Sequence, residues 1–330
     1  MAFPSPSGPN SYIWNLKQVY NARLGNNWPA GPLTGDIGIW GGFATPSISG
    51  SMQYITITSA GNATNFGDLT VARYTKDGAV ASTTRGIFQG GRSPSVSNVI
   101  DYVTIAAKGN ATDFGDLTVA RGTSGSGNNS TRGVCAGGGS PGTNVIDYIT
   151  MATTGNSTDF GDLTAGRYRL GSTSNNTRAL FFGGSIPGAQ NANIDYITIA
   201  TTGNAANFGN LTQGIRQVAG VASTTRACRG GGYSDGGPGG APAGYYATID
   251  YVTIATTGNA TSFGDLTVAR GYVSGLNNAV RGVFAGAQSP ILNVMDFITI
   301  ASTGNATDFG DLLTVGYATS GTSNANAGVQ

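Results

Sequence analysis

One 13-residue segment, GNATSFGDLTVAR at residues 258–270, occurs in six copies with small changes in this 330-residue chain. The other copies begin at Gly61, Gly109, Gly155, Gly203 and Gly304, so neighbouring copies stand 48, 46, 48, 55 and 46 residues apart. A fixed period near 50 residues indicates one structural unit used repeatedly, and this constrains the fold more than any local pattern does. We therefore expect six similar units closed into one domain.

Each unit divides into four strand-like pieces. In the second unit, residues 73–85 hold a first strand, residues 86–91 form an apolar strand that ends on two glycines, and residues 98–106 alternate along a third. The repeated segment then turns at Gly109 and Asn110 and carries an outer strand around Leu117. The 54 glycines fit many short strands joined by tight turns. Four strands in each of six units predict an all-β, six-bladed β-propeller.

The two ends of the repeat array complement each other. The first unit enters at residues 36–42, DIGIWGG, and lacks the strand that should precede this segment. Residues 317–329 match the missing strand. We expect this C-terminal strand to complete the blade that begins at Ile37, which would close a propeller of residues 34–330 and leave no open edge.

Residues 1–33 lie outside the repeat and contain a short stretch with helical spacing. A helix of fewer than four turns is marginal alone in water, so it should dock on something. It could pack on this protein's own body, or it could be an anchor that inserts into a partner, and the sequence leaves both open. The candidate anchor residues are Ile13, Trp14, Leu16, Val19, Tyr20, Leu24 and Trp28.

The charged residues argue against several functional classes. The chain has no His, its acidic residues are 16 Asp and no Glu, and its net charge is +1. The lack of His removes Ser-His-Asp catalysis and His-ligated metals, and the small net charge offers no field for nucleic acid or an anionic membrane. No apolar run is long enough to span a membrane, and no secretory signal starts the chain. We expect no enzymatic activity and no cofactor.

Other motifs have structural explanations. The Asp pairs in TDFGD lack the graded oxygen ligands of a calcium loop, and we interpret them, like the Asn of the repeat, as turn formers. The glycine-rich residues 229–244 are not followed by a phosphate-binding Lys. Cys135 and Cys228 stand in units that are not neighbours, so we expect two small buried residues and no bridge.

An arginine precedes the glycine strand in the same five units that carry Asp before an aromatic residue. The first unit lacks both. This joint presence predicts that each buried Asp pairs with the Arg of its own blade, because a buried carboxylate needs a charged partner. The predicted structural pairs are Arg85 with Asp101, Arg132 with Asp147, Arg178 with Asp195, Arg226 with Asp250 and Arg281 with Asp296.

The repeat resembles the kelch repeat over about 290 of the 330 residues. The resemblance rests on a double glycine, a Tyr one residue after Asp, an aromatic residue with a following Leu, and an Arg. It differs in one respect, since Phe stands where kelch repeats usually have Trp. In the third unit these residues are Gly137, Gly138, Tyr148, Phe160, Leu163 and Arg167.

A second resemblance bears on function. The segment IWNLKQVYNARLGNNWP and the repeated TTGNATDFGDL resemble sequences in virion structural proteins of tailed bacteriophages of marine hosts. It implies a structural or adhesion component on the exterior of a virion, attached to other virion proteins through the N-terminal segment, with a host surface glycan or protein as the candidate contact. The alternative is an intracellular kelch-type scaffold that binds another protein.

Recognition is expected on the face that carries the loop between the glycine strand and the Asp-Tyr strand. This loop differs in every unit, whereas the GNATDFGD turn is nearly constant, and variable loops on a rigid scaffold tend to carry function. The fifth copy is the longest. A surface insertion without function is the alternative. The candidate recognition residues in it are Tyr233, Asp235, Tyr245 and Tyr246.

Overall fold

The computed structural model describes residues 33–44, 47–326 and 328. The chain divides into two compact units, Met1–Leu33 and Thr34–Gln330. The candidate anchor residues all fall in the first unit, outside the described residues. All the strands of the described residues belong to the second unit.

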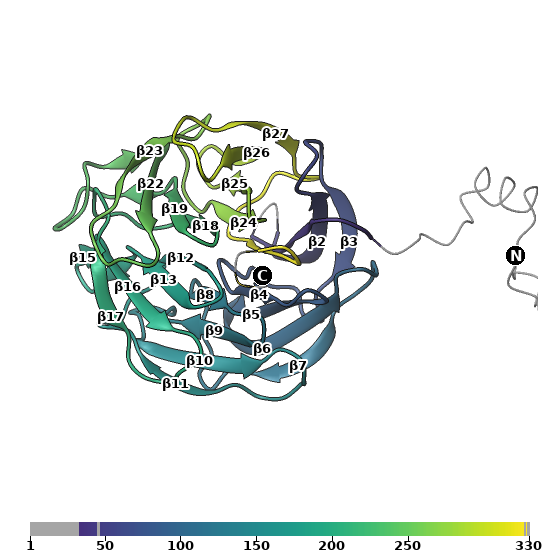
Figure 1. Ribbon diagram of the computed structural model, residues 1–330. Coiled ribbons are helices and arrows are strands. Elements are labelled where there is room, and N and C mark those ends of the chain that lie inside the picture. The colour runs from purple at the N-terminus through teal and green to yellow at the C-terminus, as the bar shows by residue number, and fades with distance from the viewer. Residues whose placement is uncertain (1–32, 45–46, 327, 329–330) are drawn as a thin grey trace, which may run out of the picture. The chain divides into compact units, whose positions relative to one another are not determined.

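Six four-stranded antiparallel sheets stand around a central axis (Figure 1), and the described residues contain no helix. The predicted all-β, six-bladed propeller is therefore confirmed. The strands of each blade are given from the innermost to the outermost. Blades 1 and 2 are β28 (Ser320–Ser323), β1 (Ile37–Phe43), β2 (Ser49–Thr56) and β3 (Thr64–Asp68), and β4 (Ala79–Ala81), β5 (Arg85–Ser93), β6 (Ser95–Thr104) and β7 (Thr112–Asp116); blades 3 and 4 are β8 (Gly125–Asn128), β9 (Arg132–Ala136), β10 (Val145–Thr150) and β11 (Thr158–Asp162), and β12 (Gly171–Ser174), β13 (Arg178–Phe182), β16 (Asn193–Thr198) and β17 (Ala206–Asn210). Blades 5 and 6 are β18 (Ala219–Ala222), β19 (Arg226–Gly230), β22 (Thr248–Thr253) and β23 (Thr261–Asp265), and β24 (Ser274–Asn277), β25 (Arg281–Ala287), β26 (Leu292–Thr299) and β27 (Thr307–Asp311).

The C-terminal strand closes the ring, as predicted. Strand β28 pairs antiparallel with β1, and the register runs from Gly38 opposite Ser323 to Gly41 opposite Ser320. The strand is shorter than the predicted residues 317–329. Blade 1 is thus built from both ends of the repeat array, which leaves no unpaired inner strand.

A second closure runs around the outer rim, and it explains the constancy of the repeated segment. At the junction of blades 2 and 3, the Gly155 N–H donates to the Phe114 carbonyl at 2.7 Å. Next to it, the Asn156 Oδ1 accepts from the Asp116 N–H at 3.0 Å. We call this the rim clasp. It recurs at all six junctions, including blade 6 with blade 1, where Asn62 Oδ1 accepts from the Asp311 N–H.

The rim clasp corrects the interpretation of this Asn as a turn former within its own blade, since its side chain binds the neighbouring blade. It also gives a reason for one glycine. Gly115 has φ of 145°, and a Cβ there would lie 2.4 Å from the Gly155 carbonyl oxygen, closer than any real contact. Only a residue without a side chain allows the two blades to approach this closely.

The hydrophobic core lies between adjacent blades. Val134, Ile146 and Phe160 of blade 3 pack with Phe181 and Ile197 of blade 4 in one buried cluster, and similar clusters lie between other blades. The Phe of the repeat packs edge-on against the Tyr that follows the Asp; the Tyr148 and Phe160 rings are 6.0 Å apart at 78°. Each blade therefore supplies half of two cores.

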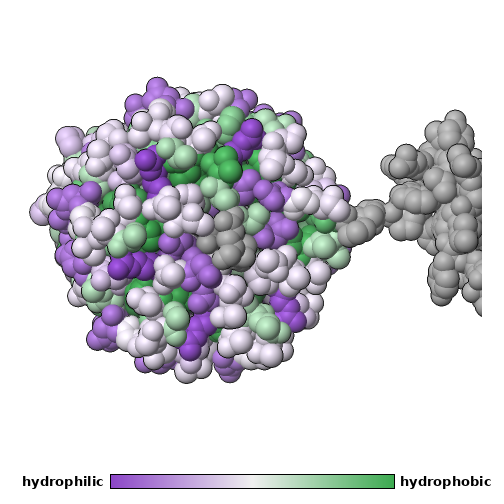
Figure 2. Space-filling view, in the orientation of Figure 1, coloured by the Kyte–Doolittle hydropathy of each residue, from purple (hydrophilic) through white to green (hydrophobic). Residues whose placement is uncertain are grey.

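The propeller has two different faces. The loop face carries the connections between the second and third strands of each blade and the crossings from one blade to the next. The turn face carries the tight turns at the opposite ends of the strands. In the space-filling view (Figure 2), hydrophobic residues are scattered among hydrophilic ones and do not gather into one continuous patch on the face drawn.

Candidate recognition face

The connections on the loop face differ from blade to blade in structure as well as in sequence. In blade 2, β5 and β6 continue pairing up to Ser93 opposite Ser95. Blades 4 and 5 instead carry small extra hairpins, β14 (Ser185–Ile186) with β15 (Ala189–Gln190), and β20 (Tyr233–Ser234) with β21 (Gly244–Tyr245). The turn face shows no such variation, since the rim clasp recurs there in every blade.

Three of the four candidate recognition residues gather around one arginine. Tyr233 and Tyr245 face each other across the blade 5 hairpin, with ring centroids 4.8 Å apart. The guanidinium of Arg216 lies 5.2 Å from the centre of the Tyr233 ring, and its Nη2 lies 3.0 Å from Asp235 Oδ2. Tyr246, the fourth candidate, donates its hydroxyl to the Pro242 carbonyl at 2.6 Å, at the base of the same loop.

The long loop of blade 5 is packed against blade 4. The Gln190 N–H donates to the Pro238 carbonyl at 3.1 Å, and the Gln190 side chain donates to Asp235. The Ala241 N–H donates to the Gly214 carbonyl, in the crossing from blade 4 to blade 5, at 3.0 Å. These bonds hold the insertion to its neighbours, so its tyrosines occupy defined positions.

Each crossing between blades holds one non-glycine residue in the left-handed region. Their φ angles lie between 54° and 61°. This backbone is uncommon for a residue with a side chain, and such residues gather at ligand sites. The backbone is repeated but the side chain is different at every position: Asp77, Thr123, Arg169, Gln217, Tyr272 and Ala318.

Two of these six residues belong to a group of arginine and tyrosine side chains on the loop face. The Arg169 guanidinium lies 5.3 Å from the centre of the Tyr168 ring and 5.7 Å from that of Tyr272. Tyr272 in turn lies 5.5 Å from Tyr317, centroid to centroid. Burial raises the pKa of Tyr74, and the nearby positive charges of Arg92 and Arg169 oppose this rise. We call Tyr74, Tyr168, Arg169, Tyr272 and Tyr317 the axial cluster.

The sequence interpretation missed the axial cluster because its members come from four different crossings. A signal was nevertheless present. The residues directly after the arginine position of LTVAR vary among the crossings, as in Tyr168-Arg169 and Gly271-Tyr272, and the first of them is Tyr in three crossings, at Tyr74, Tyr168 and Tyr317.

The central channel is narrow. The side chain of Lys76 reaches across it from blade 2. Its ammonium donates to the Val218 carbonyl of blade 5 at 3.0 Å and contacts Asp77. Burial lowers the pKa of this amine well below its usual value. A cavity of about 50 Å³ remains. This volume holds a few water molecules at most. Hydroxyl and amide groups line it, among them those of Ser126, Asn128, Ser174 and Asn277.

The predicted arginine partners of the buried aspartates are wrong, although the prediction that these aspartates are buried is confirmed. Arg85 stands opposite Thr104 in the β5–β6 ladder, whereas Asp101 stands opposite Phe88. A separation of three residues along paired strands is about 10 Å, too far for an ion pair. The observed pairs are Arg73 with Asp101, Arg121 with Asp147, Arg167 with Asp195, Arg229 with Asp250, and Arg270 with Asp296.

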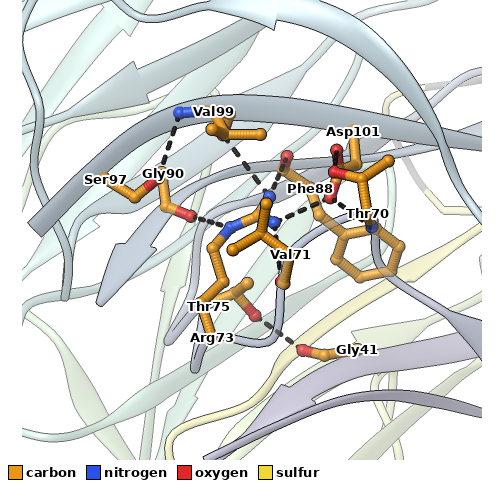
Figure 3. Close-up of polar contacts among 10 residues, drawn as sticks. All are labelled: Gly41, Thr70, Val71, Arg73, Thr75, Phe88, Gly90, Ser97, Val99 and Asp101. Carbon is orange, nitrogen blue, oxygen red and sulfur yellow. Dashed lines mark hydrogen bonds and ion pairs between the residues drawn. The ribbon is translucent and has the colours of Figure 1, made fainter. Parts of the chain in front are cut away.

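Figure 3 shows how one of these pairs is satisfied. Arg73 Nη1 lies 2.7 Å from Asp101 Oδ2, and its Nε donates to the Gly90 carbonyl at 2.7 Å. Asp101 also accepts bonds from the N–H and the hydroxyl of Thr70. A fully buried carboxylate thus has charge compensation and several donors, which offsets its loss of hydration.

The arginines of the predicted pairs have a different role. Arg132 lies over the Tyr148 ring, with its guanidinium 4.6 Å from the ring centre, and donates to the Ala200 carbonyl of the next blade at 2.9 Å. Each such arginine therefore links neighbouring blades near the turn face. The corresponding residues Arg85, Arg178, Arg226 and Arg281 lie over Tyr102, Tyr196, Tyr251 and Phe297.

Blade 5 builds its buried pair from another strand. At the crossing position where blade 3 has Arg121, the fifth blade has the buried residue Ile215. Its Asp250 is paired instead by Arg229, which stands on β19 where β9 has Cys135. The guanidinium is retained although its position in the chain has changed.

Both cysteines are buried, as predicted. Burial raises the pKa of the Cys228 thiol to about 12. No group of three or more potential metal ligands occurs in the described part of the chain. The same residues include no helix long and apolar enough to cross a membrane.

No protein-family model matches this chain, and no curated protein matches it.

Proposed function

We propose that this protein is a non-enzymatic structural and adhesion component of a bacteriophage virion that contacts the host surface through the loop face. One observation carries the proposal. Most scaffold positions hold the same residue in five or six of the blades, whereas the left-handed positions and the connections on one face hold different residues in every blade. A rigid scaffold with a single variable face is suited to recognition.

The virion assignment is supported by the resemblance of the opening segment and of the repeat to phage structural proteins, and the kelch-like assignment by the repeat motif. In this proposal the protein lies on the exterior of the particle, and residues 1–33 attach it to other virion proteins. The packed loop of blade 5, with Tyr233, Tyr245 and Asp235 around Arg216, belongs to the host-facing surface.

Two measurements test the proposal. Mass spectrometry of purified phage particles should detect the protein, and the full-length purified protein should compete with particles for adsorption to host cells. Tyr245→Ser should weaken this competition. Tyr54→Ser, which removes a half-buried tyrosine of blade 1 near the turn face, is the matched control and should leave the competition unchanged. Absence of the protein from particles would reject the virion assignment.

A second candidate function is an intracellular kelch-type scaffold. Exposed apolar side chains favour it, because most of the large ones lie on the loop face, where a protein partner could cover them. If the protein is missing from virions but retains partners in infected cells through this face, the scaffold is the better assignment. These side chains are Val71, Val96, Val119, Val268, Ile291, Leu313 and Val315.

A further inference from the structure

We propose that the axial cluster binds a carboxylate-bearing sugar, the acidic unit of a surface glycan. This inference deepens the proposed host contact and rests on it. The cluster combines a guanidinium with several tyrosine rings at the centre of the loop face, and each part of that chemistry matches one part of such a sugar.

The first part is positive charge that the protein does not neutralise. Among the described residues, the ion pairs account for Lys76 with Asp77 and for Arg216 with Asp235. Neither Arg169 nor Arg92 takes part in an ion pair of that set. The centre of the loop face therefore attracts an anion, and a guanidinium binds a carboxylate through two parallel hydrogen bonds.

The second part is aromatic. Tyr168 and Tyr272 flank the guanidinium of Arg169, and Tyr317 lies against Tyr272. Tyr272 is buried and supports the cluster from below, so the half-buried Tyr168 and Tyr317 supply the rings that a ligand can reach. Tyrosine offers an apolar ring and a hydroxyl on the same side chain. A pyranose has the matching pattern, since the C–H groups of its ring form apolar patches and its hydroxyls accept and donate hydrogen bonds. A simple inorganic anion would use the arginine but not the rings.

The third part is rigidity. The Arg169 N–H donates to the Thr123 carbonyl at 2.9 Å, and the Gln217 N–H donates to the Arg169 carbonyl at 2.8 Å. These bonds link three consecutive crossings around the axis and hold Arg169 in its left-handed conformation. A site fixed in this way loses little conformational entropy when a ligand binds.

A glycan suits this site better than an acidic peptide. Extended peptides commonly bind by adding a strand to an open sheet edge. In the described propeller, the rim clasp bonds the outer strand of each blade to the next blade, so these outer edges are not open. The axial cluster offers side chains, and a sugar needs no strand edge.

The experiment uses the full-length protein and oligosaccharides of glucuronic, galacturonic and mannuronic acid, with neutral oligosaccharides of glucose, galactose and mannose for comparison. Binding is measured by calorimetry and by saturation-transfer NMR. We expect at least one acidic probe to bind about tenfold or more tightly than its neutral counterpart, as loss of a charge-assisted bidentate contact implies. The affinity should fall as salt is raised.

Arg169→Gln should reduce this binding about tenfold, and Arg169→Lys should reduce it less because the charge remains. Lys108→Ala, which removes an exposed cation on the turn face, should leave it unchanged. Unchanged melting temperatures show that the variants are folded. Three results would overturn the inference: no acidic probe binds, neutral and acidic probes bind equally, or Arg169→Gln binds as tightly as the parent. Binding of an acidic hexapeptide alone would also overturn it.

Failure here is distinct from failure of the proposed function. If the full-length protein still blocks phage adsorption while no acidic sugar binds, the host contact stands and the ligand class is wrong. If acidic sugars bind but the protein is absent from particles, the site stands and the virion assignment is wrong.

Discussion

The propeller contains two rings of arginines, and they stabilise it in different ways. The buried ring, Arg73, Arg121, Arg167, Arg229 and Arg270, neutralises aspartates in the interior. The stacked ring, Arg85, Arg132, Arg178, Arg226 and Arg281, covers aromatic rings near the turn face.

The two rings differ in a way that separates recurrence in the sequence from energetic importance. The stacked ring keeps one position in all five blades, yet each member makes partly exposed contacts. The buried ring breaks register at blade 5, where Ile215 and Arg229 replace the usual arrangement, yet its contacts are fully buried. A missing partner is costly where water cannot replace it.

The largest expected effect is the loss of one buried arginine. Arg121→Ala should lower the free energy of unfolding by about 3–5 kcal/mol, because Asp147 would remain as a buried, uncompensated charge. Asp147→Asn added to it should recover part of this loss. Chemical denaturation of both single variants and the double variant gives the coupling energy. Additive losses would show that the pair is not coupled.

The exchange in blade 5 gives the sharpest test of the buried ring. Arg229→Cys should cost about 3 kcal/mol, as for any buried ion pair that loses one partner. Adding Ile215→Arg recreates the arrangement of blade 3, with Arg121 and Cys135, and should restore most of the stability. Ile215→Arg alone should be destabilising, since a second guanidinium would have no carboxylate. No recovery in the double variant would show that the blades are not equivalent.

A stacked arginine should matter less. Arg132→Ala should cost about 1 kcal/mol, because it removes a half-exposed cation–π contact and hydrogen bonds that water can replace. Arg132→Lys should keep part of this contribution. Thermal or chemical denaturation beside Arg121→Ala measures both on one scale. Equal losses for Arg132→Ala and Arg121→Ala would remove the distinction between the rings.

The rim clasp should give the smallest effect. Asn156→Ala removes one exposed hydrogen bond to the Asp116 N–H and should cost about 0.5 kcal/mol. Faster hydrogen exchange at that amide, with little change in the exchange of strand β10, would locate the effect at the rim. Exchange that accelerates throughout blade 3 would mean that the clasp contributes to the core as well.

The fold could be predicted from the sequence because repetition averages out local ambiguity. Six copies of one pattern specify four strands per unit, and the incomplete first unit points to the strand that completes it. The ion-pair partners could not be predicted in this way. Two arginine positions recur with the same aspartates, and only the ladder register, Asp101 opposite Phe88, separates them. The series of arginines that form the buried pairs is interrupted by Ile215, so the sequence did not show it as complete.

The candidate site was predicted only in part. The long loop of blade 5 was evident from its length, and two of its three candidate tyrosines, Tyr233 and Tyr245, lie together. The axial cluster escaped because Tyr74, Arg169, Tyr272 and Tyr317 are far apart in the chain and no local spacing relates them. They meet only because the ring brings every crossing to one axis.

The rim clasp bears on the order in which the chain forms the blades. Because Asn62 binds blade 6 as every other clasp Asn binds its preceding neighbour, the junction where the repeat array begins and ends has the same outer bonds as the other five. The geometry of the propeller is then largely independent of where the chain is cut. A circular permutant that opens a turn-face loop, such as the one after Asn129, and joins the original ends by a linker should build the same six blades.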